Sequence, residues 1–211
     1  MNNEIRVWDL LVRIFHWCLV LAFLISYLTA EEESELHIYA GYTVLGLIIF
    51  RLLWGIIGTK HSRFKDFLYS PKEVTLYLKE LITKKPKYYV GHNPAGGWMI
   101  IALLVSLFVV TISGLKVYAI EEGFGPLART TEIPIIINTY AGRDEDDEKE
   151  EYNQYSEQEE EFWEEIHEAS TNFTLFLIFF HIAGIIVASK LHNENLIKAM
   201  ITGKKKPERN T

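Results

Sequence analysis

The chain has 211 residues, of which 49% are hydrophobic and 23% charged, with a formal net charge of −7 and a mean hydropathy of +0.07. These averages would suit a soluble domain, but the apolar residues concentrate in four blocks, at residues 10–29, 37–58, 98–118 and 166–189. A block of about 20 mostly apolar residues is long enough to cross the hydrocarbon core of a bilayer. The sequence therefore predicts an all-α integral membrane four-helix bundle, with residues 1–211 forming a single transmembrane domain.

Cysteine usage limits the cofactor chemistry. Cys18 is the only cysteine in the chain. One cysteine excludes an internal disulfide, a CxxCH haem-attachment site, a CxxC zinc site and an all-cysteine iron–sulfur site. Any haem must therefore be held without thioether bonds.

The charged residues predict how the chain crosses the membrane. Residues 59–96 carry eight basic residues against three acidic ones, and residues 190–211 carry six against two. Residues 30–36 carry four acids and no base, and residues 119–162 carry 14 acids and three bases. Because Lys and Arg stay preferentially on the cytoplasmic side, both basic segments and both termini are expected inside and both acidic segments outside. The even number of spans agrees with this orientation.

Three further segments need an interpretation. The first block resembles a signal peptide in position, but its cleavage signal at 28–30 is weak and it contains Arg13 and His16, so we expect a retained helix. Residues 71–83 begin with proline and carry an apolar stripe, which predicts a short amphipathic helix on the inner membrane surface. Residues 142–161 are polar and rich in acids, which predicts a mobile segment.

Four of the seven histidines lie within or at the ends of the apolar blocks. His61, His92 and His192 fall in polar, basic segments and are interpreted as surface residues. The remaining four are His16, His37, His167 and His181. Ionisable residues in membrane helices are costly, so their presence indicates a function.

These four histidines sort into two layers. His16 lies about 9 Å into the first helix, and His181 lies in the most apolar part of the fourth. Because the helices alternate in direction, His37 and His167 are expected at the outer level, and His16 and His181 nearer the cytoplasm. His167 and His181 are 14 residues apart, close to four helical turns, so both point to nearly the same face, about 21 Å apart.

Two imidazoles on opposite sides of one flat group in a dry helix bundle are typical of a bis-histidine b-type haem. Zinc or copper would usually take three or four ligands, and neither layer offers an evident third donor. Gly41 and Gly184 lie about one turn beyond His37 and His181, where a missing side chain leaves room for a macrocycle. Glycines also serve close helix packing in membranes, so this second interpretation stays open.

Two arginines lie near the expected inner layer. Arg51 is 14 residues after His37 on the same helix, and Arg13 is one turn before His16. A guanidinium pairs well with a carboxylate, so both are candidates to bind haem propionates. The alternative is that their side chains extend to the inner headgroups, and the sequence leaves both interpretations open.

Several segments carry a further signal: Val7-Trp8-Asp9-Leu10, Phe15-His16-Trp17, Gly41-Tyr42, Phe50-Arg51-Leu52-Leu53-Trp54-Gly55, Gly91-His92-Asn93-Pro94-Ala95-Gly96-Gly97-Trp98-Met99, Gly125-Pro126-Leu127-Ala128 and His192-Asn193-Glu194-Asn195. Together with the four histidines, they resemble the prokaryotic cytochrome b561 family, which includes the cytochrome b subunits of nickel–iron hydrogenases. The resemblance covers nearly the whole chain. It implies a four-helix protein of the bacterial inner membrane with two non-covalent b haems, one held by His16 and His181 and the other by His37 and His167.

The same resemblance implies an electron carrier between the membrane quinone pool and a partner redox protein, with no nucleic-acid partner. Arg51, His92 and the loop 91–98 are the candidates for the quinone site. A periplasmic cytochrome c, attracted by the acidic outer loop, or a hydrogenase would be the partner. The run 142–161 is longer and more acidic than the family leads us to expect, which leaves the partner's identity open.

Two other functions compete with the electron carrier. A haem-free membrane protein would use the histidines to move protons or metal ions. A small-molecule reductase would pass electrons from haem to a soluble oxidant. Two ligands on each iron leave no open position, which argues against oxygen binding at the iron but not against outer-sphere transfer.

Overall fold

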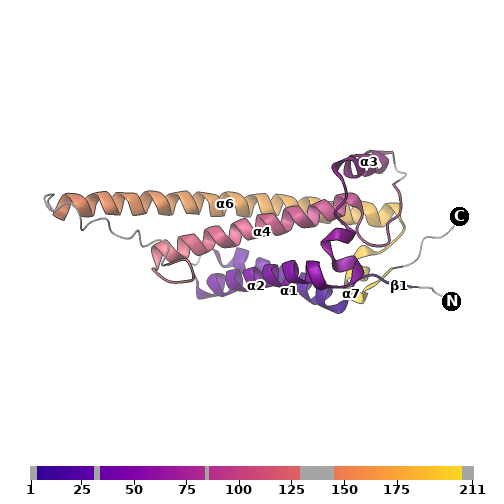
Figure 1. Cartoon of the computed structure of the whole chain (residues 1–211), viewed down its shortest axis with the longest axis horizontal. Helices are drawn as coiled ribbons and strands as arrows, with labels where there is room; N and C mark the ends of the chain where they lie inside the picture. Colours follow the sequence, from indigo (N-terminus) through magenta and orange to yellow (C-terminus); the bar gives the residue numbers. More distant parts are fainter. Residues whose placement is uncertain (1–3, 31–33, 84–85, 129–144, 206–211) are drawn as a thin grey trace. The chain divides into compact units, whose positions relative to one another are not determined.

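The computed structural model describes residues 4–30, 34–83, 86–128 and 145–205 (Figure 1). The elements follow in this order: β1 (Ile5–Arg6), α1 (Leu10–Leu28), α2 (Glu35–Ile57), the 3-10 turns η2 (Lys60–Ser62) and η3 (Phe64–Asp66), α3 (Pro71–Ile82), α4 (Pro94–Glu121), α6 (Glu145–Leu191), α7 (Leu196–Thr202) and β2 (Lys204–Lys205).

Four of these helices contain stretches that are long and apolar enough to cross a membrane. The stretches are Leu10–Leu28, Glu35–Ile57, Pro94–Glu121 and Glu157–Leu191. Each block predicted from the sequence coincides with one of them to within a few residues or lies inside it. The predicted all-α fold with four spanning helices is therefore confirmed.

The chain divides into two compact units, which are described separately. One unit comprises residues 1–105 and 174–211, and therefore holds α1, α2, α3, α7, the start of α4 and the end of α6. The other comprises residues 106–173, with the rest of α4 and the preceding part of α6. His16, His37 and His181 belong to the first unit and His167 to the second.

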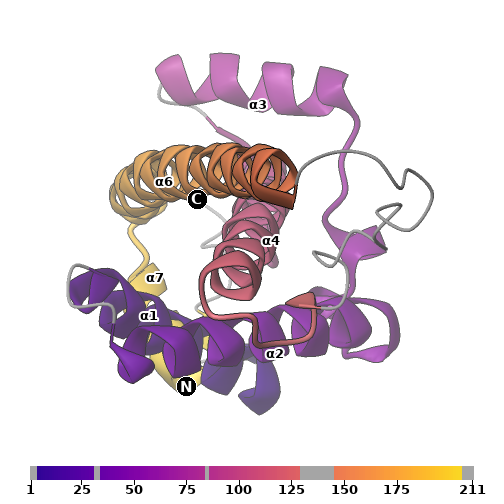
Figure 2. The same ribbon diagram turned by 90° about the vertical axis from the view of Figure 1, so that its left-hand side faces the viewer.

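Asp9 ties α1 to the end of α2. Its carboxylate caps α1 by accepting the Val12 backbone N–H at 2.9 Å, and it also accepts from Trp54 Nε1 at 3.2 Å and Thr59 Oγ1 at 2.6 Å. Burial acts to raise the pKa of Asp9, but the hydrogen bonds from Thr59, Val12 and Trp54 outweigh it and hold the pKa below its usual value. The two helices run side by side (Figure 2).

The two ends of the described chain meet in a small ribbon. β1 pairs antiparallel with β2, with Ile5 opposite Lys205. Gly203 ends α7 in the left-handed conformation, with φ of 79°, and a Cβ there would lie 2.6 Å from the Trp8 carbonyl oxygen. Glycine therefore permits both the turn and the close approach of the two segments.

α3 forms where the sequence predicts it. Ser70 and Glu73 make a reciprocal capping box, and Pro71 occupies the first helical position. Tyr77 is buried against the protein, whereas Leu78 and Ile82 are 44% and 81% exposed. The exposed leucine and isoleucine suit an apolar surface, but the placement of α3 on the membrane remains a prediction.

The prediction of a mobile segment at 142–161 is wrong for residues 145–161, because α6 begins at Glu145. Glu and Gln, which dominate this run, are strong helix formers. Acidic residues near a helix N-terminus are also favourable to the helix dipole. The low hydrophobicity of this run predicts a mobile segment, but the same composition also suits a long polar helix. Residues 142–144 lie outside the described part of the chain.

Candidate cofactor site

The two inner histidines meet in the first unit. α1 presents His16 and α6 presents His181, with ring centroids 6.5 Å apart and planes inclined at 48°. His16 Nδ1 is buried and has no hydrogen-bond partner among the described residues. A buried imidazole nitrogen without a partner is costly, so this geometry indicates a site for a group that the two rings share.

The separation of these rings matches the size of a shared metal centre. Metal–imidazole bonds are about 2.0–2.1 Å long, and a ring nitrogen lies about 1.1 Å from its centroid, so two rings on opposite sides of one metal have centroids about 6.3 Å apart. The observed 6.5 Å lies close to this value. No Cβ contact lies within 4 Å at Gly184, one turn beyond His181, so a macrocycle is not blocked there. The residues present therefore fit a bis-histidine haem.

His37 is oriented by the preceding helix. Its Nδ1 lies 2.8 Å from the Ser26 carbonyl oxygen and 3.4 Å from Ser26 Oγ. Because a carbonyl only accepts, Nδ1 carries the proton and donates it, which leaves Nε2 as the metal-binding nitrogen. Metal-binding histidines typically donate their second ring N–H in this way, since the bond fixes the tautomer and the ring orientation.

His167 has the same kind of support within the second unit. Its Nδ1 lies 3.0 Å from the Val110 carbonyl oxygen and 3.2 Å from Ser113 Oγ on α4. A Cβ on Gly114 would lie 2.8 Å from His167 Cε1, so glycine makes room for the ring against α4. The Ser113-Gly114 pair was overlooked in the sequence because its importance depends on which residue of another helix faces it.

The two outer histidines lie in different units, and their pairing across one haem stays a prediction. Gly41, on the helix of His37, would place no Cβ within 4 Å of another atom. This agrees with the space expected beside that histidine.

Arg51 is buried rather than extended to the surface of its unit. It is 3% exposed, and its guanidinium carbon lies 4.9 Å from the centroid of the Phe64 ring and 5.8 Å from that of Phe67. Its Nη1 is buried without a hydrogen-bond partner among the described residues. A buried guanidinium needs a counter-charge, so Arg51 fits the role of holding a carboxylate such as a haem propionate.

Arg13 is bound elsewhere. Its Nη1 donates to the Ile201 carbonyl oxygen, and its Nε donates to the Asp9 carbonyl oxygen at 3.4 Å. These contacts join α1 to α7. They give Arg13 a structural role at the inner end of the first helix, and its predicted role at a propionate stays a prediction.

His92 is not the surface residue that the sequence indicated. Its ring packs between Trp8 and Phe67, at centroid distances of 4.3 Å and 4.7 Å, and its Nδ1 is buried without a partner among the described residues. Burial lowers the pKa of His92 to about 3, and the positive charges of Arg51 and Lys205 act in the same direction. His92 is therefore neutral at physiological pH.

Phe67 brings His92 and Arg51 to one place. The ring of this fully buried residue contacts the His92 ring, and its centroid lies 5.8 Å from the Arg51 guanidinium carbon. Two buried polar groups with unpaired nitrogens thus lie around one aromatic ring. We call this cluster of side chains, Arg51, Phe67 and His92, the inner pocket, because it lies at the end of the spanning helices that the sequence predicts to face the cytoplasm. The clustering was hidden in the sequence because the three residues come from separate segments.

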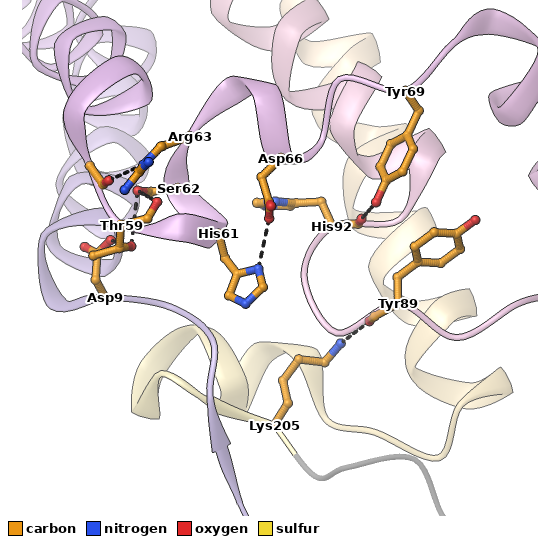
Figure 3. A network of polar contacts seen from close by, with 11 residues as sticks. Asp9, Thr59, His61, Ser62, Arg63, Asp66, Tyr69, Tyr89, His92 and Lys205 are labelled. Atoms are coloured by element: carbon orange, nitrogen blue, oxygen red, sulfur yellow. Dashed lines mark hydrogen bonds and ion pairs between the residues drawn. The ribbon is translucent and has the colours of Figure 1, made fainter.

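Polar contacts fix the loop that carries His92 (Figure 3). The Tyr69 hydroxyl donates to the His92 carbonyl oxygen at 3.2 Å, and Lys205 Nζ donates to the Tyr89 carbonyl oxygen at 3.2 Å. Lys205 is also paired with Glu194 at 3.0 Å, and both side chains are buried. The hydrogen bond from Lys205 to Tyr89 connects the C-terminal ribbon to the segment that precedes His92.

The spanning helices present four histidines. Two are oriented by backbone carbonyls, and two face each other at metal-bridging distance. These features define a membrane protein of the haem-binding class. The family described as prokaryotic cytochrome b561 matches residues 7–203, and the chain belongs to this family. It is accordingly a multi-pass protein of the bacterial inner membrane and a b-type cytochrome, a class that binds haem b.

The individual relatives that match this chain have low sequence identity to it. A protein of Rhizobium leguminosarum bv. viciae is 26% identical over 154 residues, which cover 59% of this chain and 63% of the relative. One of Azotobacter vinelandii is 30% identical over 99 residues, covering 42% and 40%. Both are described as a probable Ni/Fe-hydrogenase B-type cytochrome subunit. The chain thus spans less than two thirds of the length of these relatives, and no solved structure gives a significant match.

Proposed function

We propose that this protein is a di-haem cytochrome that relays electrons between the quinone pool of the inner membrane and a redox partner on the outer side. The observation that carries the proposal is the 6.5 Å separation of the His16 and His181 rings. The carbonyl-bound Nδ1 atoms of His37 and His167 support a second haem, because each leaves Nε2 for a metal.

The charge distribution supports an orientation with both termini in the cytoplasm. The segments 59–96 and 190–211 are basic, and the segments 30–36 and 119–162 are acidic. In this orientation the pair His16–His181 and the inner pocket lie toward the cytoplasm, and His37 and His167 lie toward the outer surface.

Haem b supplies one-electron oxidation and reduction when it is bound. The chain's residues set where this happens. The imidazoles would hold the iron, and the carbonyls of Ser26 and Val110 fix the orientation of His37 and His167. Arg51 supplies a buried positive charge for a propionate, and His92 with the segment 91–98, in which α4 begins at Pro94, offers a polar contact for the quinone head at the inner end.

Two partners suit the outer side. The relatives are described as hydrogenase cytochrome subunits, which favours a nickel–iron hydrogenase. The 14 acidic residues of 119–162 favour a basic cytochrome c by charge complementarity. The two partners differ in salt dependence, because docking through exposed charges weakens steeply as ionic strength rises.

The test uses the full chain purified in detergent. We expect a red protein with two haems per chain by pyridine haemochrome assay, whose Soret and alpha bands respond when a short-chain quinol is added. A colourless protein would favour the haem-free alternative. A haem-loaded protein that dithionite reduces and quinol does not would contradict the proposed link to the quinone pool.

A further inference from the structure

His61 and Asp66 form an ion-pairing couple beside the inner pocket. His61 Nδ1 lies 3.0 Å from Asp66 Oδ2, and the two side chains are 21% and 28% exposed, so water reaches both (Figure 3). We propose that this couple is the proton port of the inner pocket, through which protons pass between the inner aqueous phase and a quinone bound at His92. The inference rests on the quinone exchange proposed above.

The port lies directly against the loop that holds His92. A Cβ on Gly91 would lie 3.0 Å from His61 Nδ1, so the imidazole packs on the backbone immediately before His92. Glycine permits this approach without displacing the ring. Asp66 in turn immediately precedes Phe67, whose ring contacts His92. Both members of the couple are thus next to the inner pocket, one through Gly91 and the other through Phe67.

The chemistry of the couple suits proton transfer. The Asp66 carboxylate accepts a hydrogen bond from Nδ1 of His61, which leaves Nε2 to take up or release a proton. A carboxylate that holds a histidine in this way fixes its tautomer and stabilises the imidazolium that forms. Lys60, Arg63 and Lys65 flank the couple in sequence and make this surface basic.

The charges around His92 favour the release of a proton from its imidazole over its retention there. Arg51, Lys205, His61 and His181 all act on it, and burial together with Arg51 and Lys205 keeps its imidazole neutral. Glu194 offsets the charge of Lys205 through their 3.0 Å ion pair, but Arg51 Nη1 has no such partner among the described residues. A proton placed on His92 is therefore unstable there and moves on to a neighbour.

A quinol that is oxidised to a quinone gives up two electrons and two protons. The haems that the four histidines would hold would supply the one-electron acceptors, and the protons would pass from the quinol oxygens by way of His92 and the His61–Asp66 couple into water. In the opposite direction, a quinone takes two electrons supplied by the redox partner and two protons that enter through His61.

The experiment compares His61→Gln and Asp66→Asn with the wild-type chain and with the control His192→Gln. His192 is a partly exposed histidine whose ring meets the Tyr88 ring edge-on, with centroids 5.7 Å apart. The full chain in nanodiscs is mixed with a short-chain quinol, and haem reduction is followed by stopped-flow absorbance from pH 5.5 to 8.5. Dithionite reduction and the oxidised spectrum report separately on whether the haems are intact.

His61→Gln should slow reduction by quinol about 10²-fold, the lower end of what a positioned proton-transfer group contributes, while dithionite reduction stays unchanged. Added imidazole should restore part of the rate. Asp66→Asn should slow the reaction less, since the amide oxygen can still accept the hydrogen bond from His61 Nδ1. His192→Gln should behave as wild type.

Two sets of results would overturn the port. One is that both variants react at the wild-type rate with the wild-type pH profile. The other is a loss of rate that imidazole does not restore and that comes with an altered haem spectrum, which would assign His61 a structural role. A wild-type chain with intact haems that does not react with quinol would instead overturn the proposed function itself, and the port with it.

Discussion

The outer and inner histidines are supported in different ways. His37 and His167 each donate Nδ1–H to a backbone carbonyl, so their rings are oriented by the helices alone. His16 Nδ1 has no partner among the described residues, and its closest aromatic neighbours include Trp17 and His181. A backbone carbonyl is present whatever the side chain, so the orientation of the His37 and His167 rings does not need a bound group. The His16 ring lacks such a hydrogen bond, so its orientation depends more on the group that it binds. The outer site should therefore be pre-oriented, and the inner site should depend more on its haem.

The largest expected effect comes from removing an inner ligand. His181→Leu should lower the haem content from two per chain to one, because the His16 site loses its second imidazole while the oriented outer histidines remain. Pyridine haemochrome stoichiometry measures this directly. A His192→Leu control should keep both haems, and a His181→Leu protein that retains both would contradict the pairing of His16 with His181.

The outer site is tested by disturbing the orientation of the His167 ring rather than by removing the histidine. Gly114→Ala places a methyl group 2.8 Å from His167 Cε1, so the ring must move and its hydrogen bond to Val110 weakens. Loss of such outer-shell support typically costs about 10–100-fold in metal affinity. The rate of haem transfer from the protein to apomyoglobin would measure the loss.

Gly46→Ala is the matched control for this substitution. It is the same change within a membrane helix, at a glycine where an added Cβ meets nothing within 4 Å. Equal haem loss from the two variants would mean that Gly114 acts through general helix packing, and the difference between outer and inner support would lose its basis.

A substitution at Arg51 tests the inner site separately from the outer site. Its buried positive charge favours the reduced, less positive form of a nearby haem. Arg51→Gln should therefore lower the reduction potential of one haem by on the order of 60 mV, which corresponds to a tenfold change for a one-electron couple. A spectroelectrochemical titration would resolve the two proposed haems. An equal shift in both potentials would contradict an effect confined to the inner site.

The sequence predicted the parts that repeat a simple physical rule. Blocks of apolar residues located the four spanning helices, and Ser70, Pro71 and Glu73 located α3. The spacing of His16 and His181 predicted a shared level, and the structure brings the two rings together. These signals are local or periodic, so one chain suffices to detect them.

The inner pocket could not be predicted in the same way. His92 is polar and lies in a basic segment, so composition assigned it to the surface, but Trp8 from the N-terminus and Phe67 from the loop after α2 enclose it. The Ser26 and Val110 contacts use backbone carbonyls, which every residue carries. Such sites depend on which segments the fold brings together, and residue types alone contain no signal for that.

The enclosure of His92 leads to the smallest expected effect, a pH dependence of stability. Its pKa falls from 6.5 to about 3 on folding, so between these values the unfolded chain binds a proton that the folded chain does not. The stabilisation is complete above pH 6.5 and is lost progressively as the pH falls toward 3. At pH 5.5 the loss reaches about 1.4 kcal/mol relative to neutral pH.

Thermal unfolding of the purified protein at pH 7.5 and 5.5 measures this effect, with His92→Phe as the comparison. Phenylalanine keeps an aromatic ring between Trp8 and Phe67 but binds no proton, so its stability should change less between the two pH values. Asp9 does not imitate the effect in this window, because its pKa is held below its usual value and it stays ionised throughout. An identical pH response in the two proteins would show that the His92 ring is open to protons, and the inner end would then be no better shielded from water than the surface around it.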